Sequence, residues 1–593
     1  MKTFQILWLI FFLPSLLLAQ KDPNATFFFQ KNNTDTVTQA FFIDAITDPP
    51  AEPVRSMAEW EEIGAVALTY DLTGFSEPKK VLLAEIIRHA QSRVEVIVFC
   101  YGDLVFNIIG RVKNDLSRRG VPLENLTFVE TDFNNRIWIR DFGAHCAYLN
   151  DVESLVLVDW KYEPQFQNAD VKVSEAMGVV LEAPVYTTTL QPYDLKLDGG
   201  NFLTDGNGMA FSSTHVLDDN AYPAGQIDLI LQDFMGIDLY PKLPKLTFDV
   251  THHVDMHMKL LDEETLLVGQ YPEGVADGPQ IEDNVDWFVK NIKTTFGTDY
   301  KVERIIMPPD EFGNYPDSSN NCSLNLGLGC YYTYTNALFI NDLILVPIYF
   351  EGTGSDIEAL ETWRRLMPGY EVVGIDCREI IREYGAIHCV TKEIGVARPL
   401  RLVHQKVEHA CADQEFYSIK VKAQHASGVR KVKLLFKNKN ASAFDFIEMM
   451  SADGENFLAE LPKASYGDTI EYYFEAEALD GKEFTKPFPG AEGPYQLAID
   501  CQTSSVDASA TRDNLFFIVY PNPGREISFK WKGNFSREVP RYQIHDLNGR
   551  LLEDGILKGQ EGVLVKEGTL PSGMYFLKVE TETSSIIQKL IID

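Results

Sequence analysis

The chain has 593 residues with 53 basic and 86 acidic side chains, so its net charge is −33. This length predicts several domains, and the acidic balance argues against binding to nucleic acid or anionic lipid, which both require a basic surface. Apolar residues make up 45% of the chain and charged residues 23%, as in globular proteins, and eight cysteines are too few for a disulfide scaffold.

The N-terminus has the pattern of a secretory signal. Lys2 gives the positive start, residues 6–18 form a short apolar core that Pro14 interrupts, and Leu-Leu-Ala supplies a cleavage site. A retained anchor helix is disfavoured because the run is too short to span a bilayer comfortably. We therefore expect residues 1–19 to be a signal peptide. The mature protein, without a stable transmembrane segment, is then exported to a place where disulfides can form.

The pattern of the next 385 or so residues predicts a polar arm followed by an α/β domain. Residues 20–50 have few periodic apolar positions and form the arm, and residues 51–405 mix strand and helix patterns. Strand patterns occur at 66–70, 94–100, 127–131, 154–160, 265–271, 336–350 and 370–376, and helix patterns at 79–91, 104–120, 283–297 and 355–367. The order is not a clean strand–helix alternation, and no GxGxxG motif opens a helix after a strand. Neither a plain doubly wound sheet nor a dinucleotide cofactor is therefore indicated.

The last third of the chain contains strand patterns alone. Residues 406–501 alternate apolar and polar side chains, which predicts a small antiparallel, immunoglobulin-like β-sandwich. Cys411 and Cys501 flank it, and a disulfide between them would clamp its ends, although spacing alone does not assign the pairing. Residues 502–514 form a polar linker, and residues 515–593 form a second small all-β module.

The remaining cysteines divide into two groups. Cys322 and Cys330 lie in an insertion rich in glycine, asparagine and serine, where a local disulfide is our first expectation and a free pair the second. Cys100, Cys146 and Cys377 lie in or beside strand patterns, where we expect them to be buried.

Four clusters combine acidic, histidine, cysteine or amide side chains with glycine or aromatic residues. They are Trp138-Ile139-Arg140-Asp141; Asp198-Gly199-Gly200-Asn201 with Thr204-Asp205-Gly206; His252-His253-Val254-Asp255-Met256-His257; and Ala386-Ile387-His388-Cys389. Asn336 is a candidate fifth contributor.

These residue types suit a cationic substrate. A cysteine late in the chain with a histidine elsewhere is a candidate pair of nucleophile and acid/base. Neighbouring carboxylates raise the pKa of a thiol and so disfavour the reactive thiolate. Carboxylates beside a nucleophilic cysteine therefore make sense where the substrate is a cation that they hold. A guanidinium offers a planar fork of five N–H donors that two carboxylates can bind. We therefore predict that Asp141 and Asp255 hold the substrate, His253 is the acid/base and Cys389 is the nucleophile.

Each of these residues also has a structural alternative. His253, Asp255 and His257 have metal-ligand spacing, but no further motif completes a metal shell, so we expect no metal. Gly199 and Gly200 could form only a tight turn. The remaining alternatives are a turn for Asp205, core packing or a pocket wall for Trp138, a bracing role for Arg140, structural or rim positions for His252 and His257, and an outward-facing strand position for His388.

The clusters together resemble the agmatine deiminase and Porphyromonas-type peptidylarginine deiminase family. The matching stretches are MAEWEEIGAV (57–66), WIRD (138–141), GGNFLTDGNG (199–208), HVD (253–255), YTNALF (334–339), MPGYEVVGI (367–375) and AIHC (386–389). This resemblance implies a five-bladed pentein α/β propeller with a central active site. It also implies hydrolysis of an arginine side chain to citrulline and ammonia, with neither a metal nor a cofactor.

The resemblance carries over residue by residue. It implies that Cys389 attacks the guanidinium carbon and that His253 protonates the departing ammonia. His253 then activates the water that hydrolyses the thiouronium intermediate. Asp141 and Asp255 match the two guanidinium carboxylates, and Asn336 matches a pocket amide. The implied substrate-binding set is Asp141, Asp255, Asn336, Trp138, Gly199, Gly200 and Asp198.

The C-terminal segments fit the same relatives. The sandwich is similar to the immunoglobulin-like domain of the peptidylarginine type. The last module is similar to the sorting domain of type IX secretion, in which YPNP, an SG-Y-F/V stretch and a terminal lysine-containing strand recur. The resemblance implies that the type IX machinery is a partner. It also implies export across the outer membrane, followed by removal of the module or surface attachment.

The substrate is where this sequence departs from its relatives. The peptidylarginine type that prefers C-terminal arginine has two arginines that bind the α-carboxylate of the substrate. Residues 158–167 here contain no arginine; Lys161 is their only cation, and Glu163 would repel a carboxylate. Asp198 before the glycine pair is closer to the agmatine deiminases. Internal peptidyl-arginine is our first expectation and agmatine the alternative. A non-catalytic surface binding protein is the alternative of another class.

Overall fold

The computed structural model divides the chain into two compact units, residues 1–502 and residues 503–593. The described residues are 28–31, 38–39, 45–102, 107–131, 137–162, 171–316, 331–501, 516–520, 527–532, 541–545, 550–557, 561–566, 568–580 and 585–592. The predicted signal peptide, the linker and the Cys322–Cys330 pair lie outside them. In this part of the chain no helix is both long and apolar enough to span a bilayer.

A repeated strand arrangement organises the α/β part. Five times within the described residues, a strand pairs antiparallel with a second strand, which pairs in parallel with a third. The triples are β19, β4 and β5 (Lys392–Gly395, Ile63–Asp71, Glu95–Tyr101); β7, β8 and β9 (His145–Leu149, Ser154–Trp160, Val185–Thr188); β10, β11 and β12 (Leu203–Thr204, Ala210–Ser213, Lys242–Leu243); β13, β14 and β15 (Met258–Leu260, Thr265–Gln270, Lys301–Ile306); and β16, β17 and β18 (Leu338–Ile340, Leu343–Ile348, Glu371–Asp376).

Further strands extend two of these sheets. β6 (Leu126–Glu130), β1 (Phe28–Lys31) and β2 (Thr38–Gln39) continue the first sheet, and β3 (Val54–Ser56) pairs with β7 in the second. Two short segments of the predicted arm are therefore strands of the α/β part.

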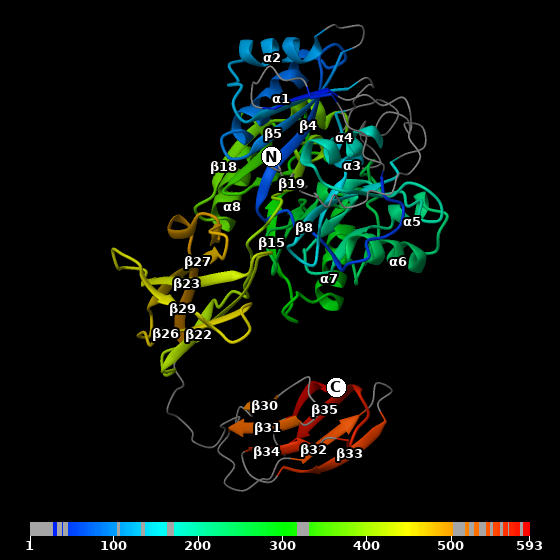
Figure 1. The fold of residues 1–593 in the computed structure, drawn as a ribbon. Coiled ribbons are helices and arrows are strands. Elements are labelled where there is room, and N and C mark those ends of the chain that lie inside the picture. Colours follow the sequence, from blue (N-terminus) through cyan, green and yellow to red (C-terminus); the bar gives the residue numbers. More distant parts are fainter. Residues whose placement is uncertain are drawn as a thin grey trace, which may run out of the picture. The chain divides into compact units, whose positions relative to one another are not determined.

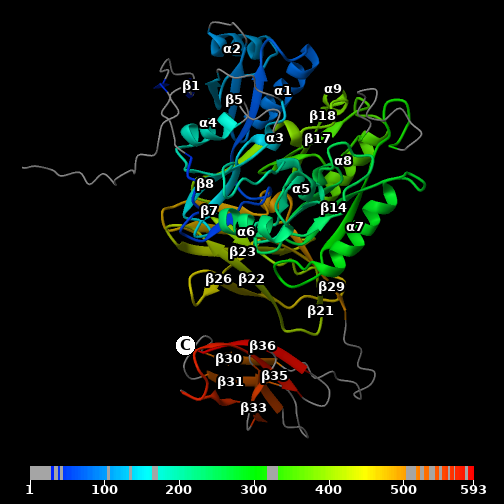
Figure 2. The ribbon, with the colours of Figure 1, turned by 90° about the vertical axis from the view of Figure 1, so that its right-hand side faces the viewer.

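Helices make the crossovers that parallel strands require. They are α1 (Glu77–Ala90), α2 (Ile108–Arg118), α4 (Val171–Leu181), α5 (His215–Asp219), α6 (Ala224–Met235), α7 (Gly278–Asn291) and α8 (Ser355–Leu366), with α9 (Arg378–Ile381) following β18. Figure 1 shows α1 and α2 beside β4 and β5, and Figure 2 shows α8 beside β18. The four helices expected from periodicity are found as α1, α2, α7 and α8, although α7 begins and ends five to six residues before its expected range of 283–297.

The sequence explains both kinds of element. Ser76 begins α1 because its side chain accepts a hydrogen bond from the backbone of Lys79, and a proline follows in the first turn. The middle strands, such as β4, are almost continuously apolar because both of their faces are covered. One hydrophobic core contains buried residues from all five triples.

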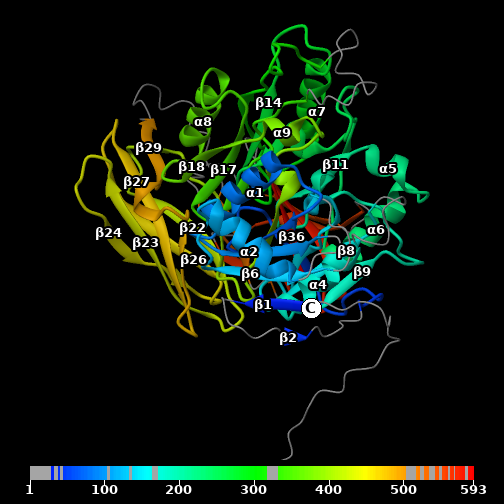
Figure 3. The same cartoon turned by 90° about the horizontal axis from the view of Figure 1, so that it is seen from above.

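Residues 401–501 form two further sheets around a core of their own. The strands of one are β20 (Arg401–Val403), β22 (Phe416–Gln424), β26 (Asn456–Pro462) and β25 (Met450–Ser451). Those of the other are β21 (His409–Cys411), β29 (Tyr495–Cys501), β27 (Thr469–Ala478), β23 (Val429–Asn438), β24 (Asp445–Glu448) and β28 (Glu483–Lys486). Figure 3 shows these strands gathered to one side of the α/β sheets.

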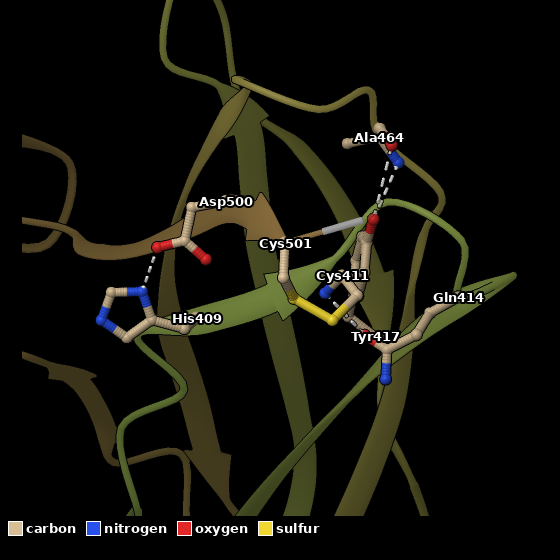
Figure 4. The surroundings of a disulfide bond; sticks show 7 residues. All are labelled: His409, Cys411, Gln414, Tyr417, Ala464, Asp500 and Cys501. Carbon is tan, nitrogen blue, oxygen red and sulfur yellow. Dashed lines mark hydrogen bonds and ion pairs between the residues drawn. A yellow bond between two sulfur atoms is a disulfide. The ribbon is translucent and has the colours of Figure 1, made fainter. Parts of the chain in front are cut away.

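The predicted disulfide between Cys411 and Cys501 is present and closes a segment of 90 residues. It joins β21 to β29, and Figure 4 shows His409 and Asp500 paired next to it. Cys100, Cys146 and Cys377 are buried and unbonded, as expected.

The sandwich touches the α/β part closely. A Cβ atom added to Gly493 would lie 1.9 Å from the carbonyl oxygen of Pro368, so two backbones meet without room for a side chain. Arg401, buried at the start of β20, donates to the carbonyl of Gly206 at 2.9 Å and to Oδ1 of Asn207 at 2.5 Å. A cavity of about 430 Å³ lies at this junction.

The C-terminal unit is a separate all-β body with its own core. One sheet contains β30 (Phe516–Tyr520), β31 (Ile527–Lys532) and β34 (Glu561–Val565). The other contains β33 (Leu551–Ile556), β32 (Arg541–His545), β35 (Gly573–Glu580) and β36 (Ser585–Ile592). The all-β prediction for this module is confirmed.

Candidate active site

The predicted residues come from short turns that precede the first strand of a triple. Each turn ends one to three residues before its strand, so the repeated sheet geometry presents the turns in equivalent places. The turns are α3 (Ile139–Phe142) before β7, η2 (Gly199–Asn201) before β10, η3 (Val254–Met256) before β13, the segment ending at Asn336 before β16, and η4 (His388–Val390) before β19.

Cys389, Asn336 and Asp255 are in direct contact. The Asn336 amide nitrogen donates to the Cys389 sulfur at 3.3 Å and to Oδ2 of Asp255 at 2.9 Å. The thiol lies 3.9 Å from the same Oδ2. The other carboxylate oxygen, Oδ1, is buried and has no hydrogen-bond partner among the described residues. Such an orphaned acceptor is available to an N–H donor of a ligand.

His253 lies between two carboxylates. Its Nε2 is 3.3 Å from Oδ2 of Asp198, and its Nδ1 is 3.8 Å from Oδ1 of Asp141. The backbone N–H of Gly200 donates to the same Asp141 oxygen at 3.1 Å. The structure therefore brings all four predicted catalytic residues into one buried cluster.

Both glycines of the Gly-Gly pair are required by close approach. A Cβ atom on Gly200 would lie 2.5 Å from Nδ1 of His253, 3.1 Å from Oδ2 of Asp255 and 3.2 Å from Oδ1 of Asp141. A Cβ atom on Gly199 would lie 2.0 Å from the Arg140 carbonyl. A larger residue would occupy the space among the site carboxylates and the imidazole, so the pair is more than the tight turn that was the alternative.

The negative charge of the cluster changes its protonation. Burial alone would lower the pKa of His253, but the carboxylates of Asp141, Asp198 and Asp255 raise it to about 10. Burial, reinforced by Asp198 and Asp255, raises the pKa of Asp141 to about 7. Burial and then the charges of Asp255 and Asp141 raise the pKa of the Cys389 thiol well above its ordinary value. Without a ligand, the site therefore holds an imidazolium and a neutral thiol.

Arg140 braces the site, as predicted. Its guanidinium forms a bidentate ion pair with Glu393, and its Nε donates to the carbonyl of His388 at 3.1 Å. All three residues are buried. The ion pair joins α3 to β19, and the hydrogen bond to His388 joins α3 to η4, so Arg140 connects the two turns that carry Asp141 and Cys389.

The expectation for His388 was wrong. An extended strand would turn its side chain away from the neighbouring cysteine, but His388 lies in the 3₁₀ turn η4. Its Nδ1 is 2.7 Å from Oδ2 of Asp255, and its Nε2 is 2.8 Å from Oε1 of Glu59.

Sequence reasoning also missed Glu59. Its only signal was its place in the MAEWEE stretch, which the family resemblance had included.

Two further predicted residues are Trp138 and Asp205. Trp138 is half-buried and packs against the hydrophobic core, and its ring lies beside Gly385, where an added Cβ atom would also be 3.0 Å from the Cβ atom of Cys389. Asp205 accepts from the backbone of Asn207 and Met209, so it is the turn residue of the alternative.

The histidines on either side of the HVD motif do not join the cluster. His252 contacts the Leu246 carbonyl through Nδ1. His257 is buried with both ring nitrogens unpartnered among the described residues. Among those residues, metal-type ligand atoms meet at Asp198, His215 and Asp219 and not at His253, Asp255 and His257.

Models of two known families match two stretches of the sequence. Residues 55–394 match the model of the family described as Porphyromonas-type peptidyl-arginine deiminase, and this stretch contains every residue of the cluster. The chain belongs to this deiminase family. Residues 518–593 match the secretion system C-terminal sorting domain, so the protein is secreted by the type IX route or attached to the cell surface.

Individual deiminases show the same relationship. The agmatine deiminase of Pseudomonas syringae pv. tomato is 24% identical over 313 residues, which cover 48% of this chain and 81% of that protein. The agmatine deiminase of Pseudomonas putida is 24% identical over 301 residues, covering 47% and 79%. A solved structure described as "putative agmatine deiminase" is 18% identical, covers 60% of this chain and 100% of its own, and has a TM-score of 0.51, which shows the shared pentein-type fold.

Proposed function

We propose that this protein is a secreted guanidino-group deiminase that converts peptidyl-arginine to peptidyl-citrulline and ammonia. The observation that carries the proposal is the state of Asp255. Its Oδ2 is held by Asn336 and His388 and lies 3.9 Å from the Cys389 thiol, while Oδ1 is buried and has no hydrogen-bond partner among the described residues. A guanidinium supplies N–H donors for that oxygen and positive charge for a pocket with several carboxylates.

Binding of the guanidinium prepares the nucleophile. The pKa of the Cys389 thiol is high because Asp255 and Asp141 repel its thiolate. A guanidinium that pairs with these carboxylates removes this repulsion and lowers the thiol pKa. The thiol then loses its proton to water and attacks the guanidinium carbon.

His253 serves both halves of the reaction. Its imidazolium donates a proton to the departing nitrogen, so ammonia leaves and the substrate remains bound to Cys389 as a thiouronium. The neutral imidazole then takes a proton from water, and the resulting hydroxide attacks the thiouronium carbon. The C–S bond breaks and the hydroxyl proton is lost to water, which leaves the neutral ureido product, a thiolate and an imidazolium. The thiolate regains its proton from water.

The export signals favour a peptide substrate. The sorting domain places the protein outside the cell, where proteins with exposed arginine side chains are available. Lys161, the one basic residue of the stretch 158–167, is paired with Asp194 at 3.8 Å, so it offers little to a carboxylate of the substrate. Residues 163–167 of that stretch lie outside the described residues. These points support an internal arginine as substrate.

Agmatine is the second candidate. The relatives described above are agmatine deiminases, and Asp198 contacts His253 from the position of their acid-Gly-Gly motif. For the domains, we propose that the five triples are the blades of a propeller around the cluster. We also propose that residues 406–501 are an immunoglobulin-like sandwich. The signal peptide of residues 1–19 remains part of this proposal.

The test compares three substrates on the secreted protein. The three substrates are a capped peptide with internal arginine, a peptide ending in arginine, and agmatine. For each, the ureido product and ammonia are measured, and the two should form in equal amounts. We expect the internal arginine to have the highest kcat/KM and Cys389→Ala to abolish its turnover. Agmatine alone as substrate would favour the second candidate. No turnover of any of the three would leave a non-catalytic binding protein.

A further inference from the structure

We propose that His388, held by Glu59, is a positioning residue that keeps the carboxylate of Asp255 in place beside Cys389 for contact with the substrate. The inference rests on the proposed function, because it concerns how the same site holds a guanidinium. It adds two residues from turns far apart in sequence, and neither touches the substrate in this account.

Two hydrogen bonds hold one oxygen of Asp255 beside the thiol. Its Oδ2 accepts from Nδ1 of His388 at 2.7 Å and from the amide of Asn336 at 2.9 Å, and it lies 3.9 Å from the Cys389 sulfur. Two hydrogen bonds to one oxygen restrict the rotation of the carboxylate and therefore fix its position relative to Cys389. Asp255 and His388 are almost completely buried, so water does not compete for these contacts.

The backbone of His388 fixes Asn336 as well. Its N–H donates to the side-chain oxygen of Asn336 at 3.1 Å and lies 3.2 Å from the backbone carbonyl of the same residue. This contact identifies the amide oxygen of Asn336 as the acceptor. Its amide nitrogen is then directed toward Asp255 and Cys389. One residue therefore orients both groups around the guanidinium.

Glu59 holds the far end of the imidazole ring. Nε2 of His388 is 2.8 Å from Oε1 of Glu59, whose other oxygen is paired with Lys259. Burial alone would raise the pKa of Glu59, but His388, Lys259 and Arg140 hold it well below its usual value. Both ring nitrogens thus face carboxylate oxygens.

The contacts of His388 form a continuous row. One ring nitrogen contacts Asp255 and the other contacts Glu59, whose second oxygen pairs with Lys259. Each member of the row limits the movement of the next, so the position of Asp255 depends on the side chains behind His388.

Two thiol reagents separate this role from a general structural one. Chloroacetamidine is a cation that resembles the guanidinium and needs Asp255, whereas iodoacetamide is neutral and needs only the thiol of Cys389. The ratio of their labelling rates at Cys389, located by peptide mapping, measures cation positioning independently of thiol reactivity. The variants are His388→Gln, His388→Asn and Glu59→Gln, with His409→Gln in the exposed part of the sandwich as the matched control.

We expect His388→Gln to reduce the ratio about tenfold or more, because its amide reaches toward Glu59 and loses the charged hydrogen bond to Asp255. His388→Asn places an amide where Nδ1 lies, so it restores much of the ratio. Glu59→Gln reduces the ratio less than His388→Gln, and His409→Gln leaves it unchanged. The KM for the arginine substrate should rise most in His388→Gln, less in Glu59→Gln, and not in His409→Gln.

Two results would overturn the proposal. The first is an unchanged ratio in His388→Gln. The second is an equal loss with both reagents that His388→Asn does not reverse, which is the result of a disordered site. If the wild-type protein prefers the cationic reagent and deiminates arginine, either result defeats only the positioning role. If the wild-type protein neither prefers the cationic reagent nor deiminates arginine, the proposed function and this inference are both wrong.

Discussion

The side-chain nitrogen of Asn336 lies 3.3 Å from the sulfur of Cys389. The same nitrogen donates to Asp255, so one amide contacts both the proposed nucleophile and a carboxylate proposed to bind the substrate. Both contacts are buried, and the segment that carries Asn336 leads directly into β16. The position of the thiol relative to the guanidinium therefore depends on this amide.

Replacement of Asn336 tests that dependence. We expect Asn336→Ala to lower kcat/KM by about tenfold to a hundredfold, the effect of losing a buried hydrogen bond to a charged group. Asn336→Asp should be worse than alanine, because a third carboxylate would raise the thiol pKa further. Steady-state kinetics measure both, with the exposed Asn291→Ala as control. Equal activity of the aspartate and alanine variants would contradict the electrostatic part of this account.

Guanidinium binding should depend on pH through Asp141. The pKa of this buried carboxyl is raised to about 7, so it is neutral below that pH and loses its attraction for a cation. Affinity should therefore fall as pH decreases through about 7, while His253, with a pKa of about 10, stays protonated throughout. The inhibition constant of an unreactive alkylguanidine between about pH 5.5 and 8.5 measures this dependence.

Asp198 provides the matched test of the same electrostatics. Its negative charge helps to raise the pKa values of both Asp141 and His253. In Asp198→Asn the binding transition should therefore move to lower pH. An affinity that is independent of pH in the wild-type protein, or a transition that Asp198→Asn does not move, would show that Asp141 does not control binding.

The junction with the sandwich should stabilise the protein through Arg401. Its guanidinium holds the turn at Gly206 and Asn207, where Arg55 also donates to the Gly206 carbonyl at 3.2 Å. We expect Arg401→Met to lower the stability of the α/β part by about 1–3 kcal/mol, because buried acceptors lose a charged donor. The midpoint of thermal unfolding measures the effect. Arg430→Met, at an exposed ion pair of the sandwich, is the control and should change little.

The disulfide should stabilise the sandwich without affecting the reaction. It closes a segment of 90 residues, and a crosslink of this length contributes about 2–4 kcal/mol. The double variant Cys411→Ala, Cys501→Ala should unfold at a lower temperature and keep a kcat/KM within about twofold of the wild type. Calorimetry and kinetics on the same preparations give both quantities. A large loss of activity in a folded double variant would place the sandwich in the reaction.

The sequence predicted the long elements and the residues of the cluster. Helix α1 is found close to its expected range because apolar spacing and the Ser76 cap are local signals. Strands of two residues, such as β10 and β12, and three-residue turns such as η4 contain too few residues for any periodicity. They form because neighbouring sheets pack around them.

Contacts within the site were less predictable than its composition. Cys389, His253, Asp141 and Asp255 were recognised by residue type, but the free oxygen of Asp255 is a property of the folded site. The orientation of His388 followed from a turn that the sequence had suggested to be a strand. Glu59 lies 329 residues from His388, and no local pattern indicates such a pair.

Covalent capture of the substrate on Cys389 tests the central claim most directly. The wild-type protein is mixed with an arginyl peptide or agmatine, quenched in acid within a turnover, and analysed by intact mass and peptide mapping. The account predicts an adduct on Cys389 with the mass of the substrate less ammonia, and no adduct or product with Cys389→Ala. Product formation by Cys389→Ala, or turnover by the wild type with an adduct elsewhere in the chain, would contradict it.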